Sequence, residues 1–428
     1  MELSNIKVSI PKIGANINNL YKSLKNIQNS IKKYNINYSR KQITDIPQIS
    51  IIKIIKYLRD AKFLDNYITL DENDIFNKIL ESNDLDKLNN WLNSNSPKMM
   101  DRVNKLLHYN KIPEKFLNPY IDNILINRFV ELNILDYLLN KLDYIHSYTI
   151  NYMNVQIKLN IYSKTKTISK KILNEIIDRI VILCLYKSTI VKLNINIDIF
   201  MTPFKKTITK DTRILTSREV NSGFTSHNYK ICIYRKEELN KVLVHELIHY
   251  LELDLDEVEF VDFYKYFNIS HSTDIKLNEG YTEILALVFN SIIISKTLTE
   301  CKKILNSELK FSLYQVGKIL NLYQFDNALE FFQRNNNSKF NQTTSVFSYF
   351  IVKTILLFNL NSFLELYYKQ KINKYNFKKL VLSFIDNDLI ELIDKFIKHI
   401  NMYRQDKGLF NNLRMTRYDN NYKVQKLI

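Results

Sequence analysis

Over most of the first 150 residues, apolar side chains recur at intervals of three and four positions. The spacing is clear in ISIIKIIKYLRDAKFL at 49–64, in DRVNKLLHYNKI at 101–112 and in FVELNILDYLLNKLDYI at 129–145, and it predicts amphipathic helices. Prolines fall between these runs or at their edges, where they can begin or end a helix. We therefore expect residues 1–150 to form a helical N-terminal domain.

The pattern changes near residue 150. NVQIKLNIYS at 154–163 alternates polar and apolar positions, as a half-buried strand does. Similar reasoning predicts the order strand, helix, strand, strand, strand, helix over 151–251, which we interpret as an α+β subdomain. After the first strand, the predicted elements are a helix at 169–186, strands at 191–204, 221–225 and 230–235, and a helix at 236–253.

The remainder, 252–428, returns to helical spacing and is expected to form a helical C-terminal subdomain. The clearest predicted helices cover 284–294, 313–323, 345–358 and 378–400. A chain of 428 residues exceeds the usual size of one core, which agrees with several subdomains. The expected fold class is thus α+β, with helical segments on both sides of the mixed region.

The amino-acid composition says little about the function of the protein. The apolar share of 46% is typical of a folded protein, and the excess of Asn, Ile, Lys, Tyr and Phe resembles that of proteins from large DNA viruses or AT-rich microbes. The net charge of +17 comes from lysines spread along the chain, and no nucleic-acid-binding motif is present. The sequence does not indicate an oligomeric state.

The sequence predicts a soluble protein of the cytoplasm, the host cytoplasm or a virion. Three cysteines without CxxC spacing argue against a disulfide framework or a cysteine zinc site. The N-terminus lacks the apolar core of a signal peptide, and the longest apolar run is too short to cross a membrane.

The stretch VLVHELIHYLELD at 242–254 carries the chemistry. On a helix, His245 and His249 lie on one face four positions apart, which suits two nitrogen ligands of one metal ion. Glu246 follows the first histidine and can serve as a general base. The alternative is a packed helix with two core histidines.

A third protein ligand is needed, and KLNEGYTEILALV at 276–288 offers Glu279. Gly280, directly after it, would let this helix pack closely on a neighbour. His271 is the competing ligand, whereas Asp254 and Asp256 follow the HELIH helix too closely to turn back onto the metal.

HELIH followed by LNEG resembles the motif pair of the gluzincin zinc metallopeptidases, over about residues 150–350. The resemblance implies a zincin-like catalytic domain, one zinc ion per chain bound by His245, His249 and Glu279, and Glu246 as general base in hydrolysis of a peptide or protein substrate. The gap between the motifs is longer here and the amine-binding glycine motif of the aminopeptidases is absent, so aminopeptidase specificity is not implied.

The same resemblance implies an edge strand above the cleft that binds extended substrate. The predicted substrate-binding residues are Asn221, Ser222, Gly223, Phe224 and Thr225.

Further residues have two interpretations each. Glu283, one turn after Glu279, is either a carboxylate that orients a ligating histidine or an ordinary solvated glutamate. The oxyanion donor expected from the resemblance is Tyr349, with Tyr314 and His227 as alternatives; each could instead be a core residue.

Two isolated histidines, and two arginines near the C-terminus, are expected to have no role in the site. His108 and His146 are expected to be surface or core residues rather than ligands. Arg414 and Arg417 are expected in a solvated basic tail, although an arginine there could bind a substrate carboxylate.

Two other function classes stay open. One is a catalytically inactive zincin-fold protein with a structural or virion role, and an intact Glu246 argues against it. The other is a basic polyanion-binding protein, whose binding would depend on salt and not on zinc.

Overall fold

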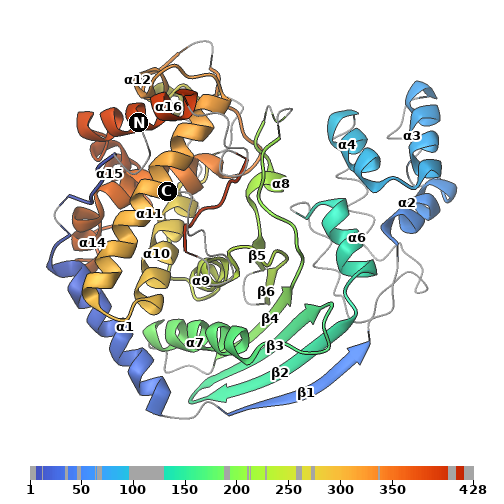
Figure 1. Cartoon of the computed structure of the whole chain (residues 1–428), viewed down its shortest axis with the longest axis horizontal. Helices are drawn as coiled ribbons and strands as arrows, with labels where there is room; N and C mark the ends of the chain where they lie inside the picture. The colour runs from blue at the N-terminus through green and yellow to red at the C-terminus, as the bar shows by residue number, and fades with distance from the viewer. Residues whose placement is uncertain are drawn as a thin grey trace.

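The computed structural model describes most of the chain. The described residues are 6–11, 13–33, 37–45, 50–62, 64, 70–95, 130–187, 193–209, 212, 214–226, 229–256, 263–270, 275–335, 338–402 and 411–418. The architecture is α+β, with one mixed sheet between two groups of helices (Figure 1). The segment 101–112, predicted to be helical, and His108 lie outside the described residues.

The sheet has six strands in the order β1-β2-β3-β4-β6-β5. Its strands are β1 (Asn37–Asp45), β2 (Tyr144–Tyr152), β3 (Val155–Ser163), β4 (Leu193–Phe200), β5 (Gly223–Ser226) and β6 (Lys230–Ile233). β3, β4 and β6 run parallel, whereas β1, β2 and β5 pair antiparallel with their neighbours. The short strand β5 therefore forms one edge of the sheet.

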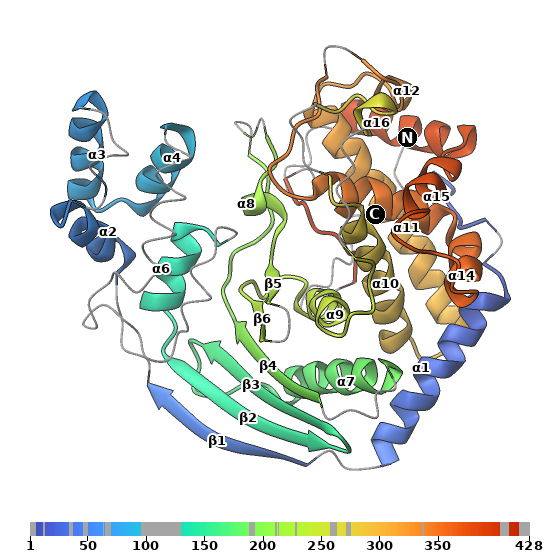
Figure 2. The ribbon, with the colours of Figure 1, turned by 180° about the vertical axis from the view of Figure 1, so that it is seen from behind.

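The predicted order of elements from 151 to 251 is confirmed except for one short helix, α8 (Ser217–Val220), which lies between β4 and β5 and was not predicted. Parallel strands need a long crossover, and helix α7 (Lys170–Lys187) supplies it between β3 and β4. α7 then packs against α9 (Leu239–Tyr250), the helix that carries HELIH. Figure 2 shows α7 and α9 on the concave side of the curved sheet.

The helical interpretation of residues 1–150 is wrong at two places, because 37–45 forms β1 and 144–152 forms β2. Moreover, α1 (Ala15–Lys33) packs against α7 and α10 and shares the main core. The alternation that marks a strand is weak in NYSRKQITD, a polar edge segment.

The other helices of this region form a separate small core. They are α2 (Ile51–Asp60), α3 (Leu70–Ser82), α4 (Leu85–Asn95) and α6 (Leu132–Asn140). Their buried apolar residues contact the opposite face of the sheet through Tyr162, Phe200 and Tyr234. Figure 1 shows this helical group standing apart from the C-terminal helices.

The helical character predicted after residue 277 is confirmed, although 378–400 forms two helices and not one. The main helices of this region are α10 (Leu277–Ile294), α11 (Leu298–Leu322), the π-helix η6 (Phe347–Val352), α13 (Lys353–Phe358), α14 (Leu360–Tyr368), α15 (Phe377–Ser383) and α16 (Asn387–Met402). Among the described residues, no single helix has both the length and the apolar composition to cross a membrane; the pair Phe347–Phe358 and Leu360–Tyr368 meets these criteria only jointly and is bent by 89°.

Candidate metal centre

Helix α9 presents both histidines of HELIH to one point. Its residues are almost entirely buried between α7, β5 and α10, so the helix is fixed on every side. The Nε2 atoms of His245 and His249 lie 3.1 Å apart, and their rings meet edge to face. This arrangement is the one predicted from the four-residue spacing.

Glu279, in the first turn of α10, faces the two histidines. Its Oε2 lies 3.4 Å from Nε2 of His245 and 3.4 Å from Nε2 of His249. That oxygen is buried and makes no hydrogen bond. One ligand atom from each residue lies within 4.8 Å of the others, so the three can bind a common ion. His271 lies outside the described residues.

Gly280 explains how α10 comes so close. A Cβ atom there would lie 2.6 Å from Cγ1 of Val352 and 3.1 Å from the carbonyl oxygen of Ser348, both on η6. The predicted close packing is therefore present, with η6 as the partner. It places the first turn of α10, and thus Glu279, against the helix that also carries Tyr349.

The far nitrogens of both imidazoles bond to carboxylates. Nδ1 of His245 donates to Oε2 of Glu283 over 2.9 Å, and Nδ1 of His249 donates to Oδ2 of Asp254 over 2.6 Å. Because each Nδ1 carries the proton, each Nε2 of a neutral ring presents a lone pair to the shared point. The two Nε2 atoms lie 3.1 Å apart, so a single cation between them can accept both lone pairs.

The electrostatics also favour positive charge at this point. Burial alone would lower the pKa of His249, yet the carboxylates of Glu279 and Asp254 raise it well above its ordinary value. Burial alone would raise the pKa of Glu279, but the two histidines hold it below its usual range. A buried carboxylate that stays ionised beside two imidazoles suits a divalent cation.

Asp254 is a partner that the sequence did not reveal. Helix α9 ends in a Schellman turn, in which the Leu253 N–H donates to the Ile248 carbonyl oxygen over 2.9 Å. Glu252 adopts a left-handed φ of 51° there, a position at which glycine is usual. The turn reverses the chain and returns Asp254 to His249, as an orienting group and not as a metal ligand.

The Glu246 carboxylate contacts β5 and lines the same cavity as His245, His249 and Glu279. The Thr225 hydroxyl donates to its Oε2 over 2.7 Å. A Cβ atom at Gly223 would lie 3.0 Å from its other oxygen, so glycine leaves room for the carboxylate. Burial raises the pKa of Glu246 above its ordinary value, although the neighbouring histidines oppose that shift.

A cavity of about 890 Å³ opens onto the three ligands and Glu246. Four of the five predicted substrate-binding residues line it, namely Asn221, Gly223, Phe224 and Thr225. Ser222 does not; its side chain is buried and lines a second cavity of about 30 Å³ behind Glu246.

Tyr349, on η6, also lines the large cavity. Its ring lies 5.9 Å from the ring of His245, measured between centroids. Burial and the nearby carboxylates raise the pKa of Tyr349 well above its ordinary value, so its hydroxyl stays protonated and can donate. Tyr314 is buried on α11 away from this cavity, and His227 lies outside the described residues.

The remaining expectations have mixed outcomes. His146 is a buried residue of β2 whose Nε2 lies 3.1 Å from the Ser163 hydroxyl, as expected of a core histidine. The solvated basic tail is wrong, because Arg414 is buried and Arg417 bonds to the interior through its backbone. Contacts with residues far away in the sequence hold this segment in place, and the local sequence does not predict such contacts.

No profile of a known protein family matches the chain, and no solved structure matches it. The uncharacterized protein R210 of Acanthamoeba polyphaga mimivirus is 33% identical over 199 residues, covering 43% of this chain and 51% of the relative. The chain thus spans about half the length of that relative. Its viral source supports the viral origin expected from the residue bias.

Proposed function

We propose that the protein is a zinc-dependent peptidase with a gluzincin-like site, in which His245, His249 and Glu279 bind the metal. The convergence of two imidazole Nε2 atoms and one buried carboxylate oxygen that has no hydrogen-bond partner among the described residues supports this most directly. Two histidines and one glutamate form a ligand set of catalytic zinc, and three protein ligands leave a position for water.

The arrangement of elements supports a zincin-like catalytic domain. The HELIH helix α9 lies beside the edge strand β5, and α10 brings the third ligand from the helical side. The cavity is lined by residues of β5 and of the first turn of α10. The resemblance to gluzincins implies the same arrangement of HELIH helix, edge strand and helix with the third ligand.

His245, His249 and Glu279 would hold the zinc ion, which would supply Lewis-acid chemistry towards a peptide carbonyl and a water molecule. Glu246 accepts the proton of the attacking water and delivers it to the leaving amine. The raised pKa of Glu246 makes its carboxylate a stronger base for the first step, and the leaving amine is itself basic enough to take the proton back in the second. The Thr225 hydroxyl keeps this carboxylate turned towards the cavity.

Tyr349 is the proposed donor to the carbonyl oxygen. Negative charge develops on that oxygen during attack, and a fixed hydroxyl stabilises it. Tyr349 fits because it lines the cavity beside His245 and stays protonated at neutral pH.

The edge strand provides the substrate track. Among the described residues, β5 pairs with β6 and with no other strand, so its other edge can pair with an extended peptide. Gly223, Phe224 and Thr225 of β5 line the cavity next to Glu246. Pairing there would bring a peptide backbone alongside the catalytic base.

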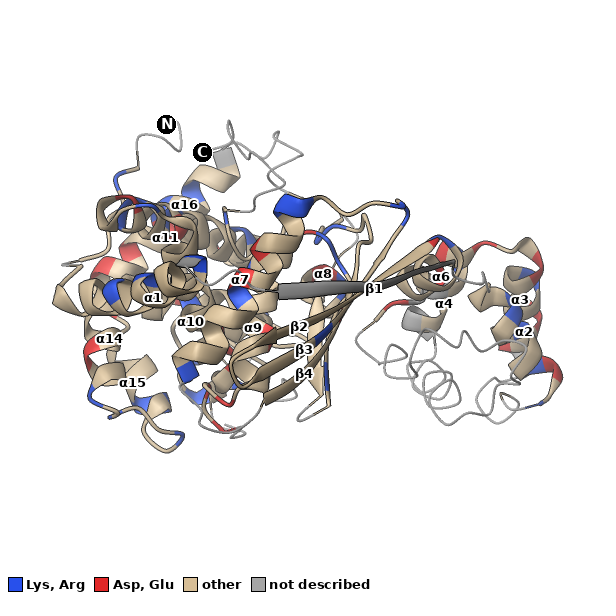
Figure 3. Cartoon of the chain, turned by 90° about the horizontal axis from the view of Figure 1, so that it is seen from below, with Lys and Arg blue, Asp and Glu red and all other residues tan. Residues whose placement is uncertain are grey.

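The observations weigh against the two other function classes. Figure 3 shows Lys and Arg interspersed with Asp and Glu along the helices, which does not favour the polyanion-binding interpretation. A structural zinc protein needs no base, yet Glu246 is buried, oriented by Thr225 and open to the cavity.

The test is replacement of Glu246 by Gln, assayed by mass spectrometry on a library of unstructured peptides. We expect zinc content to stay equal to that of the unmutated protein and hydrolysis to fall by about 10²–10⁴-fold, the usual contribution of a general base. Glu365→Gln is the control, because Glu365 is a half-exposed glutamate on α14 outside the cavity. Cleavage that survives Glu246→Gln contradicts the proposal.

A further inference from the structure

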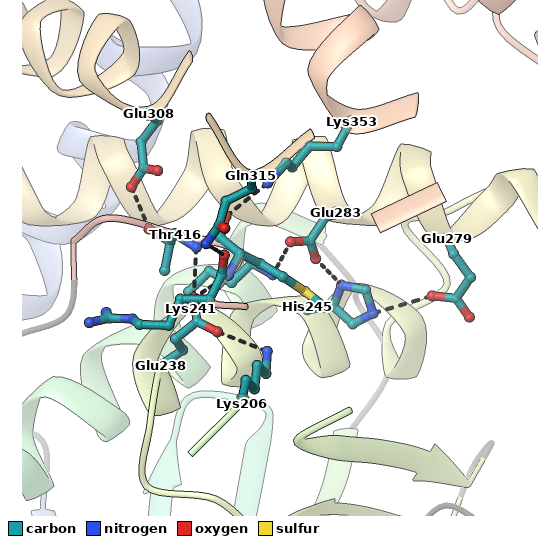
Figure 4. A network of polar contacts seen from close by, with 12 residues as sticks. Lys206, Glu238, Lys241, His245, Glu279, Glu283, Glu308, Gln315, Lys353 and Thr416 are labelled. Atoms are coloured by element: carbon teal, nitrogen blue, oxygen red, sulfur yellow. Dashed lines mark hydrogen bonds and ion pairs between the residues drawn. The ribbon is translucent and has the colours of Figure 1, made fainter. Parts of the chain in front are cut away.

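A buried network of charged side chains lies behind the metal ligands (Figure 4). Lys206 pairs with Glu238 over 2.8 Å, and Lys241 pairs with Glu283; all four side chains are at most 2% exposed. Buried ion pairs are costly to desolvate, so they are weak devices for stability alone. Lys241 lies one turn before His245 on α9, and this position suggests a different role for it.

Lys241 and His245 share one carboxylate. Lys241 Nζ donates to Oε1 of Glu283, while His245 Nδ1 donates to Oε2 of the same group. With both oxygens engaged, the carboxylate cannot rotate without breaking a contact. Lys241 therefore fixes the plane of Glu283, which in turn fixes the His245 ring.

The segment 411–418 is bound in this interior through its backbone. Oε1 of Glu238 accepts the N–H groups of Met415 and Thr416 over 2.7 Å and 2.6 Å. From the other side, Lys353 donates to the Met415 carbonyl oxygen over 2.8 Å, and Gln315 donates to that of Arg414 over 2.7 Å. These residues come from the N-cap of α9, from α11 and from α13, so the segment ties three helices together.

Glu238 is held in a strained conformation at this point. It precedes α9 with φ of 58°, in the left-handed region that a non-glycine residue rarely adopts. Such strain persists only where the surroundings impose it. Here Lys206 and the two N–H groups of the bound segment impose it.

The bound segment reaches the metal ligands through one side chain. Met415 Sδ lies 3.7 Å from Nζ of Lys241 and covers it. The path from the segment to the metal is therefore Met415, Lys241, Glu283 and His245, with a direct contact at each step.

We infer that Lys241 is a positioning residue of the metal centre, and that docking of segment 411–418 and metal binding by His245 stabilise each other. The inference rests on the metal site of the proposed function. An outer partner of a ligating histidine contributes about 10–100-fold to metal affinity. Coupling of this kind is reciprocal, so the metal must also strengthen docking of the segment.

The first test measures zinc affinity by competition with a chromophoric chelator in Lys241→Met. The matched control is Arg179→Met, because Arg179 is also 2% exposed and donates hydrogen bonds to Asn290 on α10, over 3.0 Å, and to the Glu175 carbonyl oxygen on α7. We expect zinc to bind about 10–100-fold more weakly to Lys241→Met and unchanged to Arg179→Met. Equal affinities in the two folded variants overturn the inference.

The second test needs no variant and so does not depend on folding of Lys241→Met. Hydrogen exchange of the unmutated protein is compared with and without zinc. We expect zinc to slow exchange at the Met415 and Thr416 amides and to leave α3 unchanged. Bound zinc without slower exchange at 411–418 overturns the coupling but not the proposed function, whereas failure to bind zinc at all overturns both.

Discussion

Replacement of Asp254 distinguishes a metal centre from a packed pair of histidines. Asp254 accepts the Nδ1–H of His249 over 2.6 Å, and its side chain is only 13% exposed. Asp254→Asn keeps an oxygen that can accept this hydrogen bond but removes the charge. Asp254→Ala removes both the hydrogen bond and the charge.

The expected magnitudes follow from the strength of this hydrogen bond. A hydrogen bond to a charged group contributes about 1.5–3 kcal/mol, against about 0.5–1.5 kcal/mol for a neutral one. The difference of about 1–1.5 kcal/mol corresponds to about a tenfold loss of metal affinity in Asp254→Asn. For Asp254→Ala we expect a loss of up to about 100-fold, the upper range for an outer partner of a ligating histidine.

The assay is zinc competition against a chromophoric chelator at fixed pH. Asp256→Ala is the matched control, since Asp256 lies two residues away, has a side chain that is 78% exposed and pairs only with Lys374 among the described residues. We expect the order of affinity to be unmutated protein and Asp256→Ala, then Asp254→Asn, then Asp254→Ala. If Asp254→Ala binds zinc as tightly as Asp256→Ala, the reasoning about His249 is refuted.

Two further outcomes follow from packing and burial. Gly280→Ala introduces a Cβ atom 2.6 Å from Val352, and we expect overpacking of about 1–3 kcal/mol, only partly offset by helix propensity, together with weaker zinc binding. Gly317→Ala, which is less crowded and lies on α11, is expected to keep zinc affinity, and an equal loss in both contradicts this explanation. Burial raises the pKa of Cys184 to about 12 and that of Cys301 to about 11, so the thiolate is scarce at pH 8. We expect iodoacetamide to leave the native protein unlabelled and to label all three cysteines after denaturation; rapid labelling of native Cys184 contradicts the buried assignment.

The two candidate histidine ligands could be predicted from the sequence because their spacing within one helix determines their geometry. Four-residue spacing on a helix places His245 and His249 on one face, whatever the rest of the fold. Glu279 required pairing two motifs, and Gly280 beside it marked the close helix approach that the structure contains.

The groups that orient these ligands were less accessible. Asp254 reaches His249 through a turn in which Glu252, not glycine, adopts a positive φ, so no turn residue marks it. Lys241 in KVLVHE has the sequence pattern of a surface lysine, and its burial depends on Glu283 and Met415 from distant segments.

The wrong predictions for β1 and for segment 411–418 have the same cause, namely contacts between residues that are distant in sequence. β1 lacks strong apolar alternation because it is a polar edge segment, and its pairing with β2 joins residues about a hundred positions apart. The segment 411–418 is polar and resembles a tail, yet α9, α11 and α13 bind its backbone. Neither contact leaves a periodic pattern in the chain.

The central claim is that His245, His249 and Glu279 bind one zinc ion. It is tested most directly by elemental mass spectrometry of the folded protein after chelator washing, addition of zinc and removal of the excess. We predict about one zinc per chain in the unmutated protein and none in the variant that carries both His245→Ala and His249→Ala. A folded, unmutated protein that retains no zinc would show that HELIH is only a packed helix, and would contradict the account.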